Sequence, residues 1–154
     1  MNPIARPGGG GFTLFEMLLT LAIAAGLTVL AAPSFAPALQ TARLKSATRD
    51  MASALRQARS LAVRQRRDIR LTLDIDEHRY RITGREKIHR IPEEIELKLF
   101  TADSEILGPG RGSFRFFADG SSTGGRVTLA VGARQRFVDV NWLTGQVFLR
   151  EDES

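Results

Sequence analysis

Residues 11–32 read GFTLFEMLLTLAIAAGLTVLAA and contain one charged residue, Glu16. The stretch from Met17 to Ala32 is almost entirely apolar, and about 20 apolar residues in a helix span the ~30 Å hydrocarbon core of a bilayer. Inserting a carboxylate into a membrane with its helix costs about 2.5–3.5 kcal/mol, so Glu16 is expected to have a binding partner and a functional role. The alternative is that Glu16 only favours the dipole of the helix N-terminus. Apolar residues on both sides of Glu16 argue for the first interpretation.

The residues before this run, MNPIARPGGGG, are rich in Pro and Gly, so they are not expected to form a helix or to join a core. A secretory signal peptide is the competing interpretation of the N-terminal region. Glu16 argues against it, because this carboxylate lies near the start of the apolar run. The Gly-rich stretch also precedes the run, whereas a signal peptide carries its small-residue cleavage site after the run.

After the apolar run the pattern becomes that of an amphipathic helix. Apolar residues recur at spacings of three and four, at Leu44, Ala47, Met51, Ala54, Leu55, Ala58, Leu61 and Ala62. Arginines occupy the rest of the surface, at Arg43, Arg49, Arg56, Arg59, Arg64 and Arg67. The pattern predicts one long helix from residue 12 to about residue 67, with Pro33 and Pro37 kinking or loosening it.

From Ile69 the apolar period changes from 3.6 to two, which is typical of strands. Strands are predicted at residues 69–75, 80–82, 95–100, 113–117, 126–131, 135–142 and 146–150. A long helix followed only by strands indicates an α+β fold, in which the helix covers an antiparallel sheet. Trp142 and Phe148 are expected to pack in the core.

The composition removes several classes of site. The chain has 154 residues, no cysteine and two histidines, which excludes disulfides, thiolate metal sites and a histidine metal cluster. An enzyme would have to draw its acids and bases from His78, His89, Asp74, Asp76 and Asp139. The histidines fall in a predicted turn and a charged loop, and no Ser-His-Asp or metal-ligand spacing recurs. We therefore expect no enzymatic activity and no cofactor.

The net charge of +5 comes from one stretch, since residues 43–70 hold nine basic residues and two acidic ones. The arginines of this stretch form either a solvated helix face or a surface for a polyanion such as DNA. The helix has no aromatic residue after Phe35 on which single-stranded bases could stack.

The residues Gly11-Phe12-Thr13-Leu14-Phe15-Glu16, followed by an apolar run, resemble the processing motif of type IV pilins and type II secretion pseudopilins. The resemblance implies that a prepilin peptidase cuts between Gly11 and Phe12 and that Phe12 is then N-methylated. It also implies that the Glu16 carboxylate of one subunit pairs with the Phe12 amine of a neighbour. Such a pair would set the axial register of assembly.

A second motif lies near the other end of the chain, at residues 116–125, FFADGSSTGG. No helix is predicted after it and no lysine is suitably placed, so a strand-connecting loop is favoured over a phosphate-binding loop. The stretch resembles the signature of the H-type minor pseudopilins, the GspH family, in which Phe-x-x-Asp-Gly-Ser-Ser-x-Gly-Gly precedes paired strands. The matching positions are Asp119, Gly120, Ser121, Ser122, Gly124 and Gly125.

The two resemblances imply a pilin-like protein in three parts. Residues 1–11 would be a leader removed on maturation, residues 12–38 a transmembrane and assembly helix, and residues 39–154 a periplasmic domain. The protein would be a minor pseudopilin, a single-pass protein of the inner membrane that helps the type II secretion system export folded exoproteins. Its partners would be other minor and major pseudopilins, the prepilin peptidase, the inner-membrane assembly platform and exoprotein cargo.

The alternative is a FimT-like minor pilin that acts in type IV pilus biogenesis or DNA uptake, with DNA as a partner. The implied topology also conflicts with the distribution of charge. Only Arg6 precedes the apolar run, whereas three basic residues follow it closely, at Arg43, Lys45 and Arg49. The positive-inside rule alone would place the C-terminal part in the cytoplasm.

Overall fold

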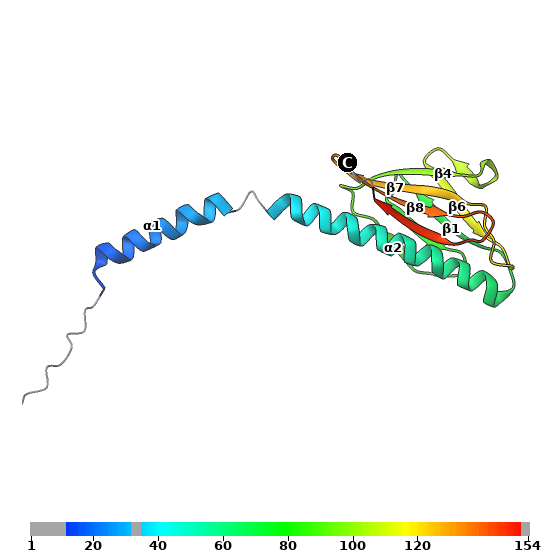
Figure 1. Cartoon of the computed structure of the whole chain (residues 1–154), viewed down its shortest axis with the longest axis horizontal. Helices are drawn as coiled ribbons and strands as arrows, with labels where there is room; N and C mark the ends of the chain where they lie inside the picture. The colour runs from blue at the N-terminus through cyan, green and yellow to red at the C-terminus, as the bar shows by residue number, and fades with distance from the viewer. Residues whose placement is uncertain (1–11, 32–34, 152–154) are drawn as a thin grey trace, which may run out of the picture. The chain divides into compact units, whose positions relative to one another are not determined.

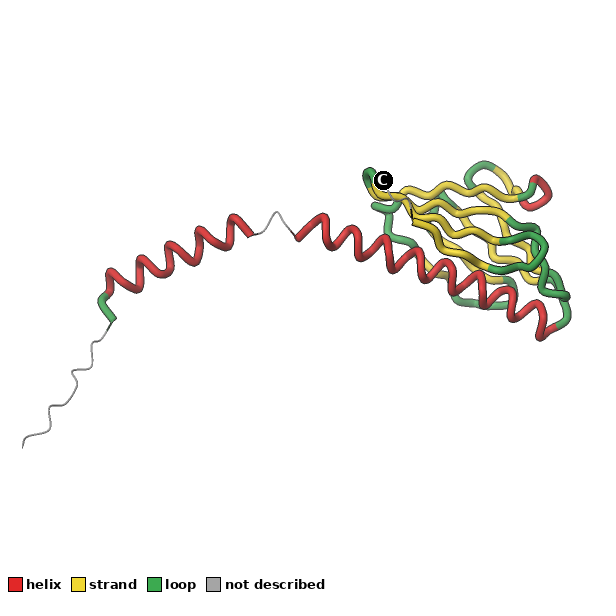
Figure 2. Tube along the Cα trace, in the orientation of Figure 1, coloured by secondary structure: helices red, strands yellow, loops and turns green. Residues whose placement is uncertain are grey.

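The structure is a computed structural model that describes residues 12–31 and 35–151, and gives only the backbone for residues 28–31 and 35–36. The predicted leader, residues 1–11, therefore lies outside the described residues. The chain divides into two compact units, one ending at Ala38 and the other beginning at Leu39. Figure 2 shows the helices and strands of each unit.

Helix α1 (Leu14–Ala31) begins with a side-chain cap. The Thr13 hydroxyl accepts a hydrogen bond from the backbone N–H of Glu16 at 3.2 Å. This Thr-x-x-Glu spacing is that of a capping box, which places Glu16 in the first turn, where the helix dipole favours a negative charge. No helix within the described residues is both long and apolar enough to cross a membrane.

Helix α2 (Phe35–Gln65) carries Pro37 in its first turn. Proline is tolerated there because the first N–H groups of a helix have no intrahelical acceptor. The helix ends at Gln65, slightly before the predicted end, with Arg66 in the left-handed region at φ 50°. The Arg67 N–H then bonds the Ala62 carbonyl at 3.3 Å, which is a Schellman ending. The predicted continuity of one helix across Pro33 lies outside the described residues.

Within the described residues nine strands follow α2, and all their pairings are antiparallel. Their bounds are β1 Ile69–Asp74, β2 Arg79–Ile82, β3 Ile88–Arg90, β4 Glu96–Thr101, β5 Ile106–Gly108, β6 Arg111–Phe116, β7 Gly125–Val131, β8 Arg134–Val140 and β9 Val147–Glu151. A short 3₁₀ helix, η2 (Asp103–Glu105), precedes β5. The predicted α+β class with antiparallel strands is confirmed.

The prediction of one sheet was wrong, because the strands form two sheets (Figure 1). One has five strands in the order β3-β2-β1-β6-β5, and the other has four in the order β4-β7-β8-β9. Strands β3 and β5 were not predicted. Each has only three residues, too few to show an alternating pattern, and each is held by one neighbouring strand.

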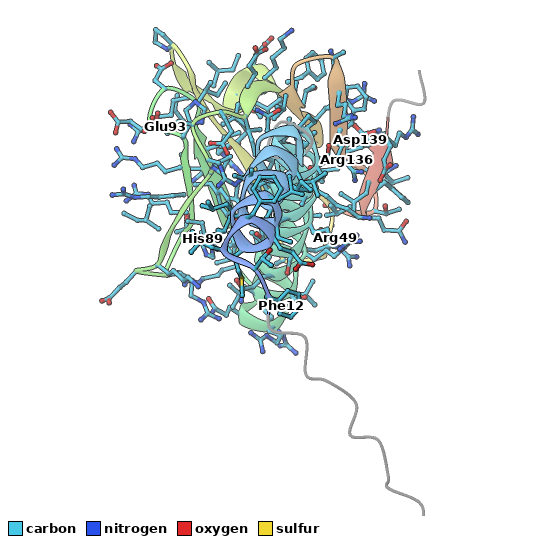
Figure 3. All side chains as sticks on the ribbon, turned by 90° about the vertical axis from the view of Figure 1, so that its left-hand side faces the viewer. Phe12, Arg49, His89, Glu93, Arg136 and Asp139 are labelled. Atoms are coloured by element: carbon cyan, nitrogen blue, oxygen red, sulfur yellow. The ribbon has the colours of Figure 1, made fainter. Side chains whose placement is uncertain are left out.

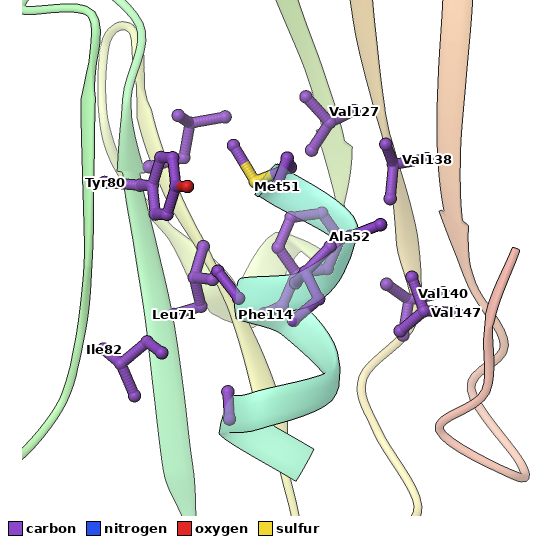
Figure 4. Packing of buried hydrophobic residues seen from close by; sticks show 14 of the residues in the cluster. Met51, Ala52, Leu71, Tyr80, Ile82, Phe114, Val127, Val138, Val140 and Val147 are labelled. Atoms are coloured by element: carbon purple, nitrogen blue, oxygen red, sulfur yellow. The ribbon is translucent and has the colours of Figure 1, made fainter. Parts of the chain in front are cut away.

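The core lies where α2 packs between the inner faces of the two sheets (Figure 4). Met51 and Ala52 of α2 face Leu71 and Tyr80 on one side. On the other side they face valines of the four-stranded sheet, at Val127, Val138, Val140 and Val147. Alternation along the strands produces this core, since Ile69, Leu71 and Leu73 are buried while Arg70 between them is exposed.

The expected burial of Trp142 and Phe148 was wrong. Trp142 follows β8 in a turn and is 67% exposed. Phe148 pairs with Asp139, on the outward side of β8, and so it also faces away from the core. Its neighbour Val147 takes the inward position, because successive side chains of a strand point to opposite faces.

We expect Phe114→Ala to destabilise the protein by about 3–5 kcal/mol, because Phe114 is fully buried and its loss leaves a cavity in the core. Phe100→Ala is the matched control, since Phe100 is 76% exposed and its removal opens no cavity. Urea unfolding followed by circular dichroism measures both free energies of unfolding. Equal effects of the two substitutions would contradict the described packing.

Candidate functional site

The loop between β6 and β7 contains the Asp-Gly-Ser-Ser residues of the second motif. The Asp119 carboxylate accepts hydrogen bonds from the Ser121 backbone N–H at 2.9 Å and from the Ser121 hydroxyl at 2.6 Å. These bonds close a tight Asx turn, and Gly120 within it has φ +88°. The same bonds hold the pKa of the Asp119 carboxyl below its usual value. The predicted strand-connecting loop is confirmed.

The second half of the loop supports the turn that carries Trp142. Ser122 is buried, its N–H bonds the Trp142 carbonyl at 2.9 Å, and its hydroxyl accepts a bond from the Gly124 N–H at 3.1 Å. A side chain on Gly124 would meet the Trp142 Cβ at 2.9 Å, and one on Gly125 would strike the Phe100 carbonyl. The small residues of the motif are therefore required by close packing.

Arg59 of α2 joins this loop to the helix. Its Nε donates to the Gly120 carbonyl at 2.9 Å. The turn at residues 141–146 closes over the same place, because a Cβ on Gly145 would overlap the Gly120 carbonyl and lie 2.9 Å from the Arg59 Nε. The β6–β7 loop, the turn at residues 141–146 and α2 thus meet around the Arg59 guanidinium. The sequence did not distinguish Arg59 from the other arginines of α2.

Two further arginines of α2 also bind the domain itself. Arg56 donates to the Val147 carbonyl at 3.2 Å, and Arg43 forms an ion pair with Glu94 at 2.6 Å. The hydrogen bond from Arg43 lowers the pKa of the Glu94 carboxyl. Arg49 and Arg64 remain exposed. The arginine stripe predicted from sequence is therefore divided, because three of its members hold α2 in place.

The acid–base candidates are distributed over both sheets. His89 of β3 stacks on Tyr80, with ring centroids 4.9 Å apart, and lines a hollow of about 650 Å³ beside α2. Partial burial lowers the pKa of His89, and nearby Lys87 adds to this effect. Burial raises the pKa of Tyr80 to about 12.

The remaining candidates lie in different surroundings. Asp139 lies in β8 of the other sheet and pairs with Arg126 and Arg150; Figure 3 shows His89 and Asp139 on opposite sides of α2. Asp74 pairs with two arginines, Asp76 lies against Gly110, and His78 occupies the β1–β2 turn at φ 45°. In the part of the chain that the structure describes, no three His, Asp or Glu side chains are grouped to hold a metal ion.

Comparison with known proteins identifies the family of this chain. The family model of the type II transport protein GspH matches residues 47–145, from α2 to the turn beside Gly120. The chain belongs to the GspH family. It is 34% identical over 145 residues to the type II secretion system protein H of Xanthomonas campestris pv. campestris, a match that covers 94% of this chain and 85% of the relative.

Solved structures show the same pilin-like fold at much lower identity. The minor pilin FimU of Pseudomonas aeruginosa is 18% identical with a TM-score of 0.58, over 75% of this chain and 96% of FimU. The minor pseudopilin EpsH of Vibrio cholerae is 12% identical with a TM-score of 0.58, over 73% of this chain and 99% of EpsH. The predicted family and the predicted pilin-like α+β fold are thereby confirmed.

Gly145→Ala tests the junction around Arg59, and Gly132→Ala is its matched control. Both glycines have positive φ, +64° and +58°, so an alanine at either costs about 1 kcal/mol of backbone strain. Gly132 has open space around it, whereas a methyl group at Gly145 overlaps the Gly120 carbonyl. We expect Gly145→Ala to lower the free energy of unfolding by at least about 2 kcal/mol more than Gly132→Ala does, because it also displaces the Arg59 hydrogen bond. Thermal unfolding measures both variants. Equal losses of stability would contradict the close contact of the loop, the turn and Arg59.

Proposed function

We propose that this GspH-family chain is a minor pseudopilin, a structural subunit of a type II secretion pseudopilus that helps export folded exoproteins across the outer membrane. The observation that supports it most is the 34% identity, over almost the whole chain, to a protein named type II secretion system protein H. The geometry agrees with a structural role, since the family signature packs a loop against a helix and a turn.

The proposal includes a maturation step. Residues 1–11 are a leader that the prepilin peptidase removes by cutting between Gly11 and Phe12, after which Phe12 is N-methylated. Residues 12–38 then form the transmembrane and assembly helix in the inner membrane, and residues 39–154 form the periplasmic domain. The support is the processing motif together with the apolar run from Met17 to Ala32. The excess of basic residues after the run argues in the other direction.

Glu16 has two roles in this proposal. Its place in the first turn of α1, three residues after Thr13, helps helix α1 to begin. In the assembled filament its carboxylate pairs with the N-methylated amine of Phe12 in a neighbouring subunit. Breaking such a pair would leave an uncompensated buried charge, which costs about 3–5 kcal/mol.

The partners follow from the proposed place in the secretion machine. They are the other minor and major pseudopilins, the prepilin peptidase, the inner-membrane assembly platform and exoprotein cargo. No enzymatic step is assigned to the chain. The alternative, a FimT-like minor pilin, rested on the arginine stripe of α2, and the contacts of Arg43, Arg56 and Arg59 within the domain reduce that support.

Deletion of the gene decides between the two functions. We expect secreted enzymes to accumulate in the periplasm of the deletion strain while DNA uptake stays normal, and a plasmid copy of the gene to restore export. Enzyme activity in the medium and transformation frequency are measured in the same strain. Normal export together with lost transformation would assign the protein to a type IV pilus.

Variants of the first turn of α1 separate the two roles of Glu16. Glu16→Gln keeps a side chain suited to the capping box but removes the charge. Thr13→Ala removes the helix cap, which lowers the stability of the helix by about 1 kcal/mol, and keeps the charge. We expect Glu16→Gln to abolish incorporation into the pseudopilus and Thr13→Ala to preserve it. Cross-linking of sheared filaments measures incorporation. The pairing role is wrong if Glu16→Gln assembles normally.

A further inference from the structure

The outer face of the five-stranded sheet is covered by arginines from separate parts of the sequence. Strand register places Thr72 opposite Arg81, and it places the other outward residues of β1, β2, β3 and β6 on the same face. Six of these outward residues are arginines, which together we name the arginine face: Arg70, Arg79, Arg81, Arg90, Arg111 and Arg115. The alternate residues of β1, β2 and β6 face the core.

The arginine face is compact. Adjacent strands lie about 4.8 Å apart and alternate residues of a strand about 6.7 Å apart, so the six Cα atoms fall within roughly 14 Å by 14 Å. Among the residues that the structure describes, the arginine face pairs with Asp74 and Glu105, and Glu77 reaches Arg79 from the neighbouring turn. The face therefore has a strong excess of positive charge.

The two carboxylates lie beneath the arginines. Glu105 is 1% exposed and contacts Arg70 at 3.4 Å and Arg115 at 2.8 Å. Asp74 is 15% exposed and contacts Arg79 at 3.9 Å and Arg111 at 3.5 Å. Each carboxylate holds two guanidinium groups in position while exposing little negative charge to solvent. A binding partner would therefore meet preorganised positive charge.

Arg81 and Arg90 complete the face in a different way. Both are exposed, and neither forms an ion pair with any residue that the structure describes. Arg81 lies opposite Ile88, an apolar residue that is 52% exposed. This part of the face thus combines free guanidinium groups with an accessible apolar side chain.

We propose that the arginine face binds an acidic, carboxylate-bearing surface of a neighbouring pseudopilin, an inference that rests on the proposed function. The basic residues of the face are arginines, and arginine is enriched in protein interfaces. Its planar guanidinium group can donate two parallel hydrogen bonds to one carboxylate. Exposed Ile88 supplies the apolar contact that such interfaces contain. Single-stranded nucleic acid is disfavoured, because none of the outward residues of β1, β2, β3 and β6 is an aromatic on which bases stack.

The test uses Arg81→Gln together with Arg90→Gln, because neither arginine supports a buried carboxylate. The matched control is Arg49→Gln together with Arg64→Gln, which removes the same charge from exposed positions of α2. The purified full-length chain in detergent is titrated with each other pseudopilin of the same secretion system, at about 0.15 M salt and at higher salt. Circular dichroism checks that both variants fold. Vesicles containing phosphatidylglycerol and a duplex DNA are the comparison probes.

We expect one pseudopilin to bind the wild-type chain, with a dissociation constant about tenfold higher for the Arg81/Arg90 variant and a weaker dependence on salt. The control variant should change the constant less than about twofold. Arg81→Lys with Arg90→Lys should bind at an intermediate strength, because lysine keeps the charge and lacks the fork.

Three results would overturn the inference while leaving the proposed function intact. The Arg81/Arg90 variant could bind the pseudopilin as the wild type does, or the control variant could lose as much affinity. The variant could also lose only its binding to the vesicles or the DNA, which would make the occupant a phosphate polyanion. A wild-type chain that binds no pseudopilin would remove the proposed function and this inference together.

Discussion

The close approach of α2 to two sheets is the constraint on which the rest of the structure depends. The buried face of the helix is rich in alanine, at Ala47, Ala52, Ala54, Ala58 and Ala62. These small side chains let strands come near the helix on both sides, while Met51 and Leu55 fill the remaining space. Once the inner faces of both sheets are fixed against α2, alternation decides which residues of every strand face outward.

Polar contacts complete this packing at the margins of the helix. Arg56 donates to the Val147 carbonyl of β9, and Arg59 donates to the Gly120 carbonyl of the β6–β7 loop. Arg134 of β8 donates to Thr41 of α2. Arginine can do this because its long aliphatic stem packs along apolar surface while its head reaches a polar partner. The charge of this helix therefore contributes to the tertiary structure as well as to the surface.

The sequence was sufficient for features that depend on local pattern. Strand β1 was predicted because Ile69, Leu71 and Leu73 alternate with polar residues. Features that depend on strand partners were not predictable. Strands β3 and β5 form because each pairs with one neighbouring strand. The turn that carries Trp142 is held by the hydrogen bond from the Ser122 N–H to the Trp142 carbonyl, which leaves the indole exposed. The arginine face could not be anticipated, since its residues come from four strands.

Alternation in β1 and β6 has a consequence for how members of such a family can diverge. Every second residue of these strands packs in the core, and the residues between them face outward, where several also pair with Asp74 or with the buried Glu105. Two selective pressures therefore act on the same short segments. A lineage that exchanges these outward arginines, and so changes its neighbours, must also replace the carboxylates that they pair with, while the inward set continues to specify the same fold.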